Sequence, residues 1–341
     1  MHKPDNFIGI DISAETFDAA IYRDKIPVIS SKEPFENNPN GFKVFCDWLQ
    51  SNKVSRDNSA ICMEITGVYS EVICYYLHDQ GYVVWAEAPH KVHRAFHMQN
   101  KNDKTSAIQI AEYIYRFFDQ IKPFKPNEAI IEQIKTLLTT REQLVSQSTA
   151  NKNILHSVKR KHYQTPLANE LLKETIEHLE KSVKKIDKEL RNLINNNSKF
   201  APIATALSSI PGIKMLFIAN FLVVTNGLTE YLNYKSLASY IGICPNEFKS
   251  GTSVYRKPKS SGYGPPRLRK LLYLASMSVK NNRKKFADYF ILKQNQGKAN
   301  GLILNNIANK LLRIICAISK NGSVYLTNYK SVHPRFLKQG A

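Results

Sequence analysis

The sequence predicts an α/β N-terminal domain, a long helical arm and a mostly α-helical C-terminal domain that carries a basic loop. Three observations lead to this division. Short strand-like apolar runs alternate with helical patterns up to about residue 120, an apolar seam without glycine follows, and lysine and arginine crowd the rest. The expected boundaries are 5–122 for the α/β domain, 127–198 for the arm, 200–326 for the C-terminal domain and 327–341 for a polar tail.

Short connections between the first apolar runs predict a meander of three strands, and helices and strands alternate after it. The expected strands cover 7–12, 16–22, 27–31, 60–65 and 82–86, and the expected helices cover 41–50, 70–78, a segment from about 90, and about 105–119. The order βββαβαβα resembles the ribonuclease-H-like fold. Pro123 and Pro126 mark the exit from this domain.

The arm is predicted from a seam of apolar residues at alternating spacings of four and three. The seam consists of Leu172, Ile176, Leu179, Val183, Ile186, Leu190 and Leu193. This spacing is typical of a coiled coil. Two long helices joined near residues 162–165 fit it as a hairpin or as a dimer arm, and a packing strut within one chain is the plainer alternative.

Charge is unevenly distributed along the chain. The 48 lysines and arginines exceed the 28 acidic residues by 20. Residues 1–120 hold 12 basic and 16 acidic side chains, whereas residues 121–341 hold 36 basic and 12 acidic ones. Such an excess favours a polyanionic partner, and nucleic acid is the first candidate because phosphate neutralisation supplies most non-specific affinity. The acidic first third makes sense if its carboxylates hold cations that bridge to phosphate.

The sequence predicts a cytoplasmic protein without a membrane span. No apolar run reaches 18 residues, and the N-terminus lacks the pattern of a signal peptide. The five cysteines are odd in number and form no C-x-x-C pair, so we expect buried thiols in a reducing compartment, not disulfides or a zinc site.

Three acidic residues form a candidate metal site. Asp11 ends the first predicted strand, Glu64 ends the fourth, and Asp103 lies near the start of the last helix. If the first and fourth strands are adjacent, the carboxylates come together and repel one another unless divalent cations bind between them. Two such cations can orient a scissile phosphate. The alternative is three ordinary strand-end or capping acids.

A cation-rich stretch follows Phe248. Eleven lysines or arginines and no acid occur between Phe248 and Ala287. The candidate phosphate contacts among them are Lys249, Arg256, Lys257, Lys259, Arg267, Arg269 and Lys270. Ser250 precedes Gly251, where a backbone can be approached closely, so its hydroxyl is a candidate nucleophile for a phosphodiester. The alternative is a serine that caps a turn or contacts phosphate.

Motifs in both halves of the chain resemble those of one known family. The N-terminal motifs are Ile8–Asp11, Met63–Gly67 and Asn100–Asp103, and the C-terminal ones are Ile210–Ile213, Tyr240–Pro245, Lys249–Gly251 and Gly264–Arg269. Together they look like the DEDD transposases of the IS110/IS1111 insertion sequences, a family that includes the Piv-type DNA invertases. The resemblance covers nearly the whole chain in the right order.

The resemblance implies a RuvC-like domain, a coiled-coil arm and a serine-bearing domain that together recombine DNA at specific sites. It implies that Asp11, Glu64 and Asp103 bind Mg²⁺ and that Ser250 becomes covalently linked to DNA. It further implies a homodimer or homotetramer, and in the insertion-sequence branch a structured bridge RNA that guides the choice of target and donor DNA.

One position departs from the family pattern. A second aspartate is expected three residues after Asp103, where this chain has Ser106, a weaker and neutral ligand. A neighbour such as Glu112 substitutes for it, one metal binds poorly, or the copy is inactive. Three alternatives to a guided transposase therefore stay open: a Piv-like invertase, a metal-only nuclease that uses water as nucleophile, and a degenerate nucleic-acid-binding protein.

Overall fold

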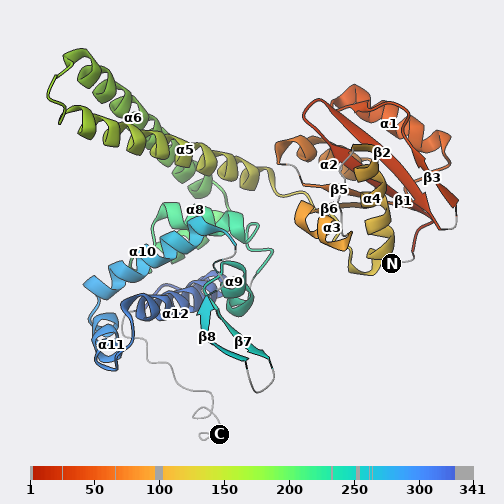
Figure 1. Cartoon of the computed structure of the whole chain (residues 1–341). Coiled ribbons are helices and arrows are strands. Elements are labelled where there is room, and N and C mark those ends of the chain that lie inside the picture. The colour runs from red at the N-terminus through yellow and green to blue at the C-terminus, as the bar shows by residue number, and fades with distance from the viewer. Residues whose placement is uncertain are drawn as a thin grey trace, which may run out of the picture. The chain divides into compact units, whose positions relative to one another are not determined.

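The computed structural model describes residues 3–24, 26–65, 67–96, 103–231, 233–250, 254–260, 262 and 264–326. For residues 103–105, 246–250 and 254–259 it describes the backbone but not the side chains. The chain forms two compact units, Met1–Pro126 and Asn127–Ala341 (Figure 1). We describe each unit by itself.

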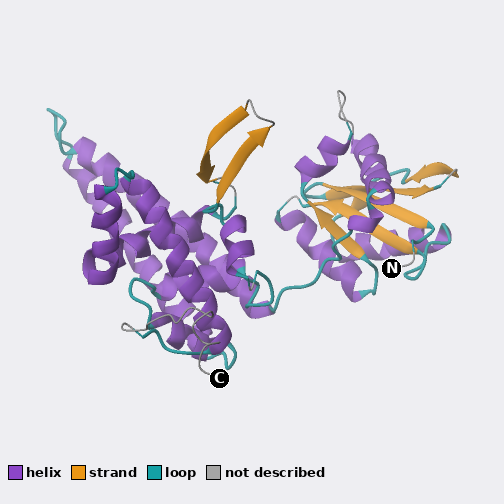
Figure 2. Ribbon diagram, turned by 90° about the horizontal axis from the view of Figure 1, so that it is seen from below, coloured by secondary structure: helices purple, strands orange, loops and turns teal. Residues whose placement is uncertain are grey.

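The first unit is a mixed sheet with helices on both faces (Figure 2). Its elements are β1 (Asn6–Ile12), β2 (Thr16–Arg23), β3 (Ile26–Ser30), β4 (Phe35–Glu36), α1 (Pro39–Ser51), β5 (Ser59–Glu64), α2 (Val68–Asp79), β6 (Val84–Glu87), α3 (Pro89–Ala95), α4 (Asp103–Arg116) and the 3₁₀ turn η1 (Phe118–Gln120). The strand order is β3-β2-β1-β5-β6, and β4 pairs with β2. The predicted α/β class is confirmed. The strand β4 was not predicted, because two residues are too few to show a periodic pattern.

Alternation along the central strands separates two cores. On one face, Ile10 and Met63 pack in a cluster with Phe42 and Phe45 of α1 and with Ile73 of α2. On the other face, a second cluster joins strand residues such as Phe7 and Cys62 to Ile110 and Ile114 of α4. The central strands are therefore buried on both sides, which fixes their register firmly.

The second unit is helical except for one β-hairpin. Its elements are α5 (Ala129–Val158), α6 (Pro166–Asn195), α7 (Phe200–Ser208), α8 (Met215–Val224), α9 (Tyr234–Tyr240), β7 (Pro245–Ser250), β8 (Val254–Ser260), α10 (Pro266–Asn282), α11 (Lys284–Asn295) and α12 (Asn300–Asn321). The predicted helical C-terminal region is confirmed. The basic segment expected as a loop is instead largely the two-stranded antiparallel hairpin β7–β8 (Figure 2), whose few apolar residues do not alternate regularly with polar ones.

Helices α5 and α6 pack against each other as an antiparallel pair (Figure 1). Ile176 and Leu179 of the predicted seam are buried between them, and the Arg141 guanidinium donates to both oxygens of Asp187, at 2.6 and 3.2 Å. Of the arrangements open from the sequence, a hairpin within the chain is what the structure contains. The supercoil of a true coiled coil stays a prediction.

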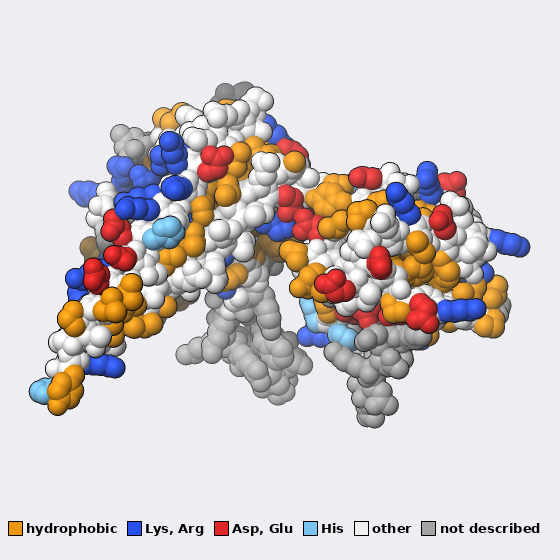
Figure 3. All heavy atoms as spheres, turned by 90° about the horizontal axis from the view of Figure 1, so that it is seen from above, with side chains coloured by type: hydrophobic (Ala, Val, Ile, Leu, Met, Phe, Trp, Pro, Cys, Tyr) orange, Lys and Arg blue, Asp and Glu red, His pale blue; other side chains and the backbone are white. Residues whose placement is uncertain are grey.

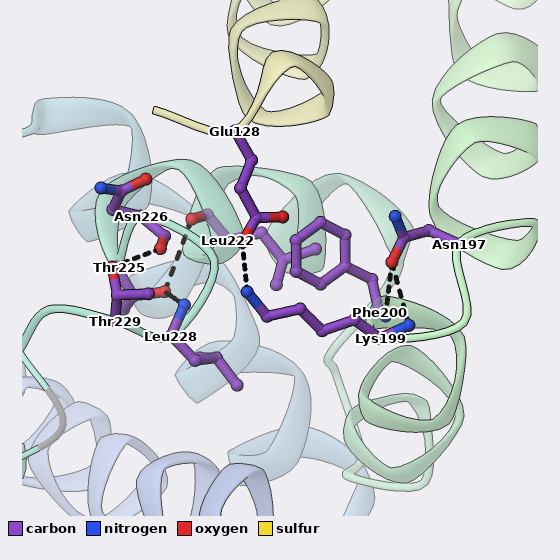
Figure 4. A network of polar contacts seen from close by, with 9 residues as sticks. All are labelled: Glu128, Asn197, Lys199, Phe200, Leu222, Thr225, Asn226, Leu228 and Thr229. Carbon is purple, nitrogen blue, oxygen red and sulfur yellow. Dashed lines mark hydrogen bonds and ion pairs between the residues drawn. The ribbon is translucent and has the colours of Figure 1, made fainter. Parts of the chain in front are cut away.

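The base of this hairpin is built into the core of the second unit. Ile134, Leu190 and Ile194 belong to the same buried cluster as α7, α8 and α12. Beside this cluster, Lys199 pairs with Glu128, and Asn197 accepts hydrogen bonds from the backbone of Lys199 and Phe200 at 3.0 Å (Figure 4). The predicted division of this unit into an arm and a serine-bearing domain stays a prediction, because the two share one core.

Helix α12 is long and apolar enough to cross a membrane by length and composition, and it alone passes that test in the described part of the chain. Half of its most apolar window is buried in the structure, where Ile307, Leu311 and Ile315 pack in the helical core. Such burial is what a core helix requires. The five cysteines are free thiols; Cys62, Cys74 and Cys316 are buried as predicted, whereas Cys46 and Cys244 are half-buried.

Candidate functional site

A row of four carboxylates crosses the sheet of the first unit. Asp11 of β1 pairs directly with Asp18 of β2, and Glu64 of β5 pairs directly with Glu87 of β6. The β1–β5 register runs parallel through Ile10 and Met63, so Asp11 and Glu64 follow at the same level. Directly opposed residues point to the same face of a sheet. The acidic row, as we call these four residues, therefore lies on one face and at one level of four neighbouring strands.

Helix α4 covers the face that bears the acidic row and runs antiparallel to β1. Phe7 contacts the ring of Tyr115, and a Cβ on Gly9 would overlap the backbone of Ala107 and Ala111. Two residues along β1 are about 7 Å, which corresponds to four or five helical residues. Asp11 therefore lies level with the first turn of α4, which begins at Asp103.

The acidic row lies beside two titratable groups that are buried, Cys62 and Tyr113. Burial, followed by the charges of Glu87 and Glu64, raises the pKa of the Cys62 thiol well above its usual value. Burial, followed by the charges of Glu87 and Cys62, raises the pKa of Tyr113 to about 12. Both groups stay neutral at physiological pH, so the negative charge in this region belongs to carboxylates.

The four carboxylates differ in their partners. Glu87 is 6% exposed, pairs with Lys91 at 2.9 Å and accepts the backbone N–H of Ala88 at 2.8 Å. Glu64 is half-buried and makes no ion pair with a described cation. Asp18 has one carboxylate oxygen that is buried and accepts no hydrogen bond in the described structure. Among the described side chains, the charge of Glu87 is thus compensated, and that of Glu64 has no cation beside it.

The donor set fits a hard divalent cation. Carboxylate oxygens are the ligands that Mg²⁺ prefers, and a cation offsets the repulsion among neighbouring acids. The described side chains include no group of three metal-ligating residues close enough to hold an ion by themselves, and that search excludes the side chain of Asp103. Ser106, one turn after Asp103, is half-buried and engaged with another residue.

Sequence reasoning identified Asp11 and Glu64 but missed Asp18 and Glu87. The signal for Asp18 was present, because a tight hairpin around residues 13–15 places Asp18 opposite Asp11. The signal for Glu87 was its place directly after the last predicted strand. The structure brings the backbones of Asp11, Glu64 and Asp103 to one end of the sheet, as the sequence suggested.

The serine and several candidate phosphate contacts lie on the β7–β8 hairpin of the second unit. Ser250 is the last residue of β7 and pairs with Val254, the first residue of β8. Lys249, Arg256 and Lys259 pair with Tyr255, Phe248 and Asn246, and Lys257 also belongs to β8. The side chains of these five candidates lie outside the described part of the structure, so their contacts stay predictions.

Three more candidate phosphate contacts lie at the start of α10 and differ in how far the protein engages them. Arg267 pairs with Glu142 of α5, and burial lowers its pKa. Arg269 donates to the backbone carbonyl of Ile241 at 2.9 Å. Lys270 is exposed. The guanidinium of Arg269 thus supports the chain that leads into β7, a positioning role that the sequence did not suggest.

Comparisons with known proteins match both halves of the chain. A family model for DEDD transposases of the IS110 type matches residues 8–164, and a model described as the transposase IS116/IS110/IS902 family matches residues 204–290. A pilin gene-inverting protein of Moraxella lacunata is 27% identical over 92% of this chain and 95% of its own length, and that of Moraxella bovis matches equally. An insertion element IS110 protein of Streptomyces coelicolor is 26% identical over 36% of this chain and 30% of its own length.

Proposed function

The chain belongs to the IS110 family of transposases and is a DNA recombinase, and from this premise we propose that it recombines DNA at specific sites through a covalent serine–DNA intermediate. The observation that carries the proposal is the acidic row beside the first turn of α4. We take the first unit to be RuvC-like, in keeping with the strand order and with α4 over the acidic face.

Asp11, Glu64 and Asp103 are the proposed Mg²⁺ ligands. They come from two adjacent strands and a helix start, elements whose packing fixes the backbone. When bound, the ion neutralises phosphate charge and orients the scissile group. Asp18 adds a fourth carboxylate at the same level, on the side of Asp11 away from Glu64. Lys91 neutralises Glu87, so Glu87 adds no net negative charge to the site.

Ser250 is the proposed nucleophile. Its oxygen forms a bond to phosphorus while the bond from phosphorus to one DNA oxygen breaks, and the serine proton ends on the released DNA hydroxyl. The reaction conserves the phosphodiester energy, so the strand can be rejoined without a cofactor. Lysines and arginines of the same hairpin supply positive charge where negative charge develops.

The test is to trap the intermediate. Wild-type protein, Ser250→Ala and Asp11→Asn are incubated with Mg²⁺ and DNA that carries a nick beside the recombination site, and then denatured. We expect a protein–DNA adduct with wild-type protein alone, digestible to a phosphoserine peptide. Cleavage by Ser250→Ala without an adduct would replace this mechanism with a metal-only nuclease.

DNA inversion is a second candidate outcome, favoured by one observation. The pilin gene-inverting proteins match over nearly their whole length, whereas the insertion element protein of Streptomyces coelicolor matches over 30% of its length. A plasmid with a segment between inverted copies of the flanking sites distinguishes inversion from excision by the orientation of the product.

A guide RNA and a homodimer or homotetramer complete the proposal. The excess of basic residues in the last two thirds of the chain supports an RNA partner on charge alone. Sequencing of RNA that co-purifies with the protein tests the guide, and light scattering with and without DNA tests the assembly. Recombination by RNA-free protein would favour the invertase over the guided transposase.

A further inference from the structure

Four cations form a second charged surface on the helical unit, on elements other than the β7–β8 hairpin. This cation cluster consists of Lys285 and Lys293 on α11 and Lys310 and Arg313 on α12. Two tyrosines lie among them. The ring centre of Tyr289 is 4.0 Å from Lys310 Nζ and 5.9 Å from Lys293 Nζ, and the ring centre of Tyr234 is 4.7 Å from the guanidinium carbon of Arg313.

No described carboxylate neutralises the cation cluster. None of its four members makes an ion pair with a described acidic side chain, and Asp288 is the only acidic residue among residues 248–341. Partial burial, followed by the charges of Lys285, Arg313 and Lys293, lowers the pKa of Lys310. Like charges held together in this way cost stability, and an anion that binds among them offsets the cost.

Aromatic faces hold three of the four cations, Lys293, Lys310 and Arg313, in place. A cation over a tyrosine ring gains about 0.5–1 kcal/mol at exposed sites, which restricts a long side chain that would otherwise sweep through solvent. Arg313 is held twice, because it also donates to the Tyr234 hydroxyl at 3.4 Å. The surface therefore presents positive charge at fixed positions, as a repeating polyanion requires.

Helix α12 links the cation cluster to the strand that bears the serine. Asn305 and Asn309 of this helix both donate to the carbonyl of Ile243, at 3.0 and 3.4 Å, two residues before β7 begins. Lys310 follows directly after Asn309. A nucleic-acid backbone bound on the cation cluster is thus held by the same helix that fixes the start of the hairpin.

We propose that the cation cluster binds the phosphate backbone of duplex DNA and holds the duplex in register with the β7–β8 hairpin. The choice of DNA rests on the proposed function, because the same helix supports the serine-bearing strand. Contacts of this kind position the duplex without reading its sequence. RNA bound at this surface is the rival outcome of the test.

The test replaces all four members with glutamine: Lys285→Gln, Lys293→Gln, Lys310→Gln and Arg313→Gln. A matched control removes four exposed cations of the α/β unit by Lys43→Gln, Lys53→Gln, Lys122→Gln and Lys125→Gln. Both proteins carry Ser250→Ala and are titrated with unrelated duplex DNA and with duplex RNA, in chelator, over a series of salt concentrations. Binding is thereby measured apart from chemistry.

For the cluster variant we expect the slope of log affinity against log salt on duplex DNA to fall by about 0.9 for each lost phosphate contact, hence by about 2 to 4 in all. The control slope should change by less than about 0.5. Equal slopes for the two variants, or an effect confined to RNA, would overturn the proposal. If Ser250→Ala with Mg²⁺ still cleaved DNA while the salt slopes behaved as expected, the serine mechanism would fail and the assignment of this surface would stand.

Two further variants guard against a folding artefact. Lys310→Gln alone removes one repelled charge, so its melting temperature should not fall, and its salt slope on DNA should drop by about 0.9. Replacement of the three lysines by arginine keeps the charge and should keep the wild-type slope. An unchanged slope for Lys310→Gln, or a weakened slope for the arginine variant, contradicts phosphate binding by charge.

Discussion

The two units of the chain hold charge in opposite ways. In the α/β unit, carboxylates lie on central strands with a hydrophobic core on each face. In the helical unit, cations lie on a two-stranded hairpin and on helix surfaces, and Figure 3 shows a group of lysine and arginine side chains on that unit with some acidic side chains beside it. On the α/β unit in the same view, acidic and basic side chains are mixed.

The difference fits the roles that we propose for the two sets of charges. Acids that share a metal repel one another, so only a rigid backbone can keep them close before the ion arrives. Phosphate contacts tolerate variation in position, because their energy comes largely from counterion release. Changes that touch the strands of the first unit should therefore act sharply, and changes of single surface cations in the second should act gradually.

The largest effect that we expect in the α/β unit comes from Glu64→Gln, which keeps the shape of the side chain and removes its charge. Glu64 has no described cation as a partner, so its loss should not damage folding. We expect recombination to fall by about 10²-fold or more, with unchanged DNA affinity in chelator. The exposed Glu71→Gln on α2 is the control, and full activity of Glu64→Gln would remove this carboxylate from the site.

The next largest effect concerns the close approach of α4 to β1. A Cβ at Gly9 would overlap the backbone of Ala107 and Ala111, so Gly9→Ala must push the helix away from the sheet. We expect the unfolding transition of the α/β unit to lose about 3 kcal/mol. Gly301→Ala at the start of α12 meets open space and should change stability by less than about 1 kcal/mol. Denaturant unfolding compares the two, and equal effects would refute the contact.

The base and the far end of the α5–α6 hairpin offer a comparison within one element. Leu190 is 1% exposed in the core of the second unit, whereas Leu171 is 52% exposed. Leu190→Ala should destabilise that unit by about 2–5 kcal/mol, and Leu171→Ala by less than about 0.5 kcal/mol in a monomer. A large, concentration-dependent effect of Leu171→Ala on melting would show instead that the far end is an interface between chains.

The smallest effect sharpens the account of the departure from the family pattern. Ser106→Asp restores a carboxylate one turn after Asp103. Without metal the added charge should lower the melting temperature slightly, and with Mg²⁺ it should raise it, because affinity for the ion increases by about 10-fold. Calorimetric titration with Mg²⁺ measures the affinity. Weaker binding would place the ion away from the first turn of α4.

The strands and helices of the α/β unit other than the two-residue β4 were predictable because they are long enough to show their period. The same reading placed Asp11, Glu64 and Asp103 at strand and helix ends. The short turn at residues 13–15 could have placed Asp18 opposite Asp11, but the pairing of β5 with β6 that places Glu87 opposite Glu64 could not be predicted. Register depends on turn length and on packing between strands, and a local pattern does not carry the packing.

The basic segment was harder because strand formation there is not driven by burial of alternate residues. The large apolar residues of β7 and β8 are Phe248, Val254 and Tyr255, and they do not alternate with polar ones, so the apolar pattern shows no period of two. Arg269 was expected on phosphate from its charge alone, and the structure places a backbone carbonyl at its guanidinium. A cation in a basic segment can bind phosphate or can support the protein backbone, and sequence does not separate these two roles.

The ends of the β7–β8 hairpin meet in space. Gly264 has φ +96° and packs so closely on the carbonyl of Tyr240 that a Cβ there would overlap it. The chain therefore enters and leaves the hairpin at one point. Changes in the length of the hairpin can then be accommodated while the helices stay unchanged. Grafting the segment from another recombinase at this point is accordingly a practical route to exchange the part that we propose contacts DNA.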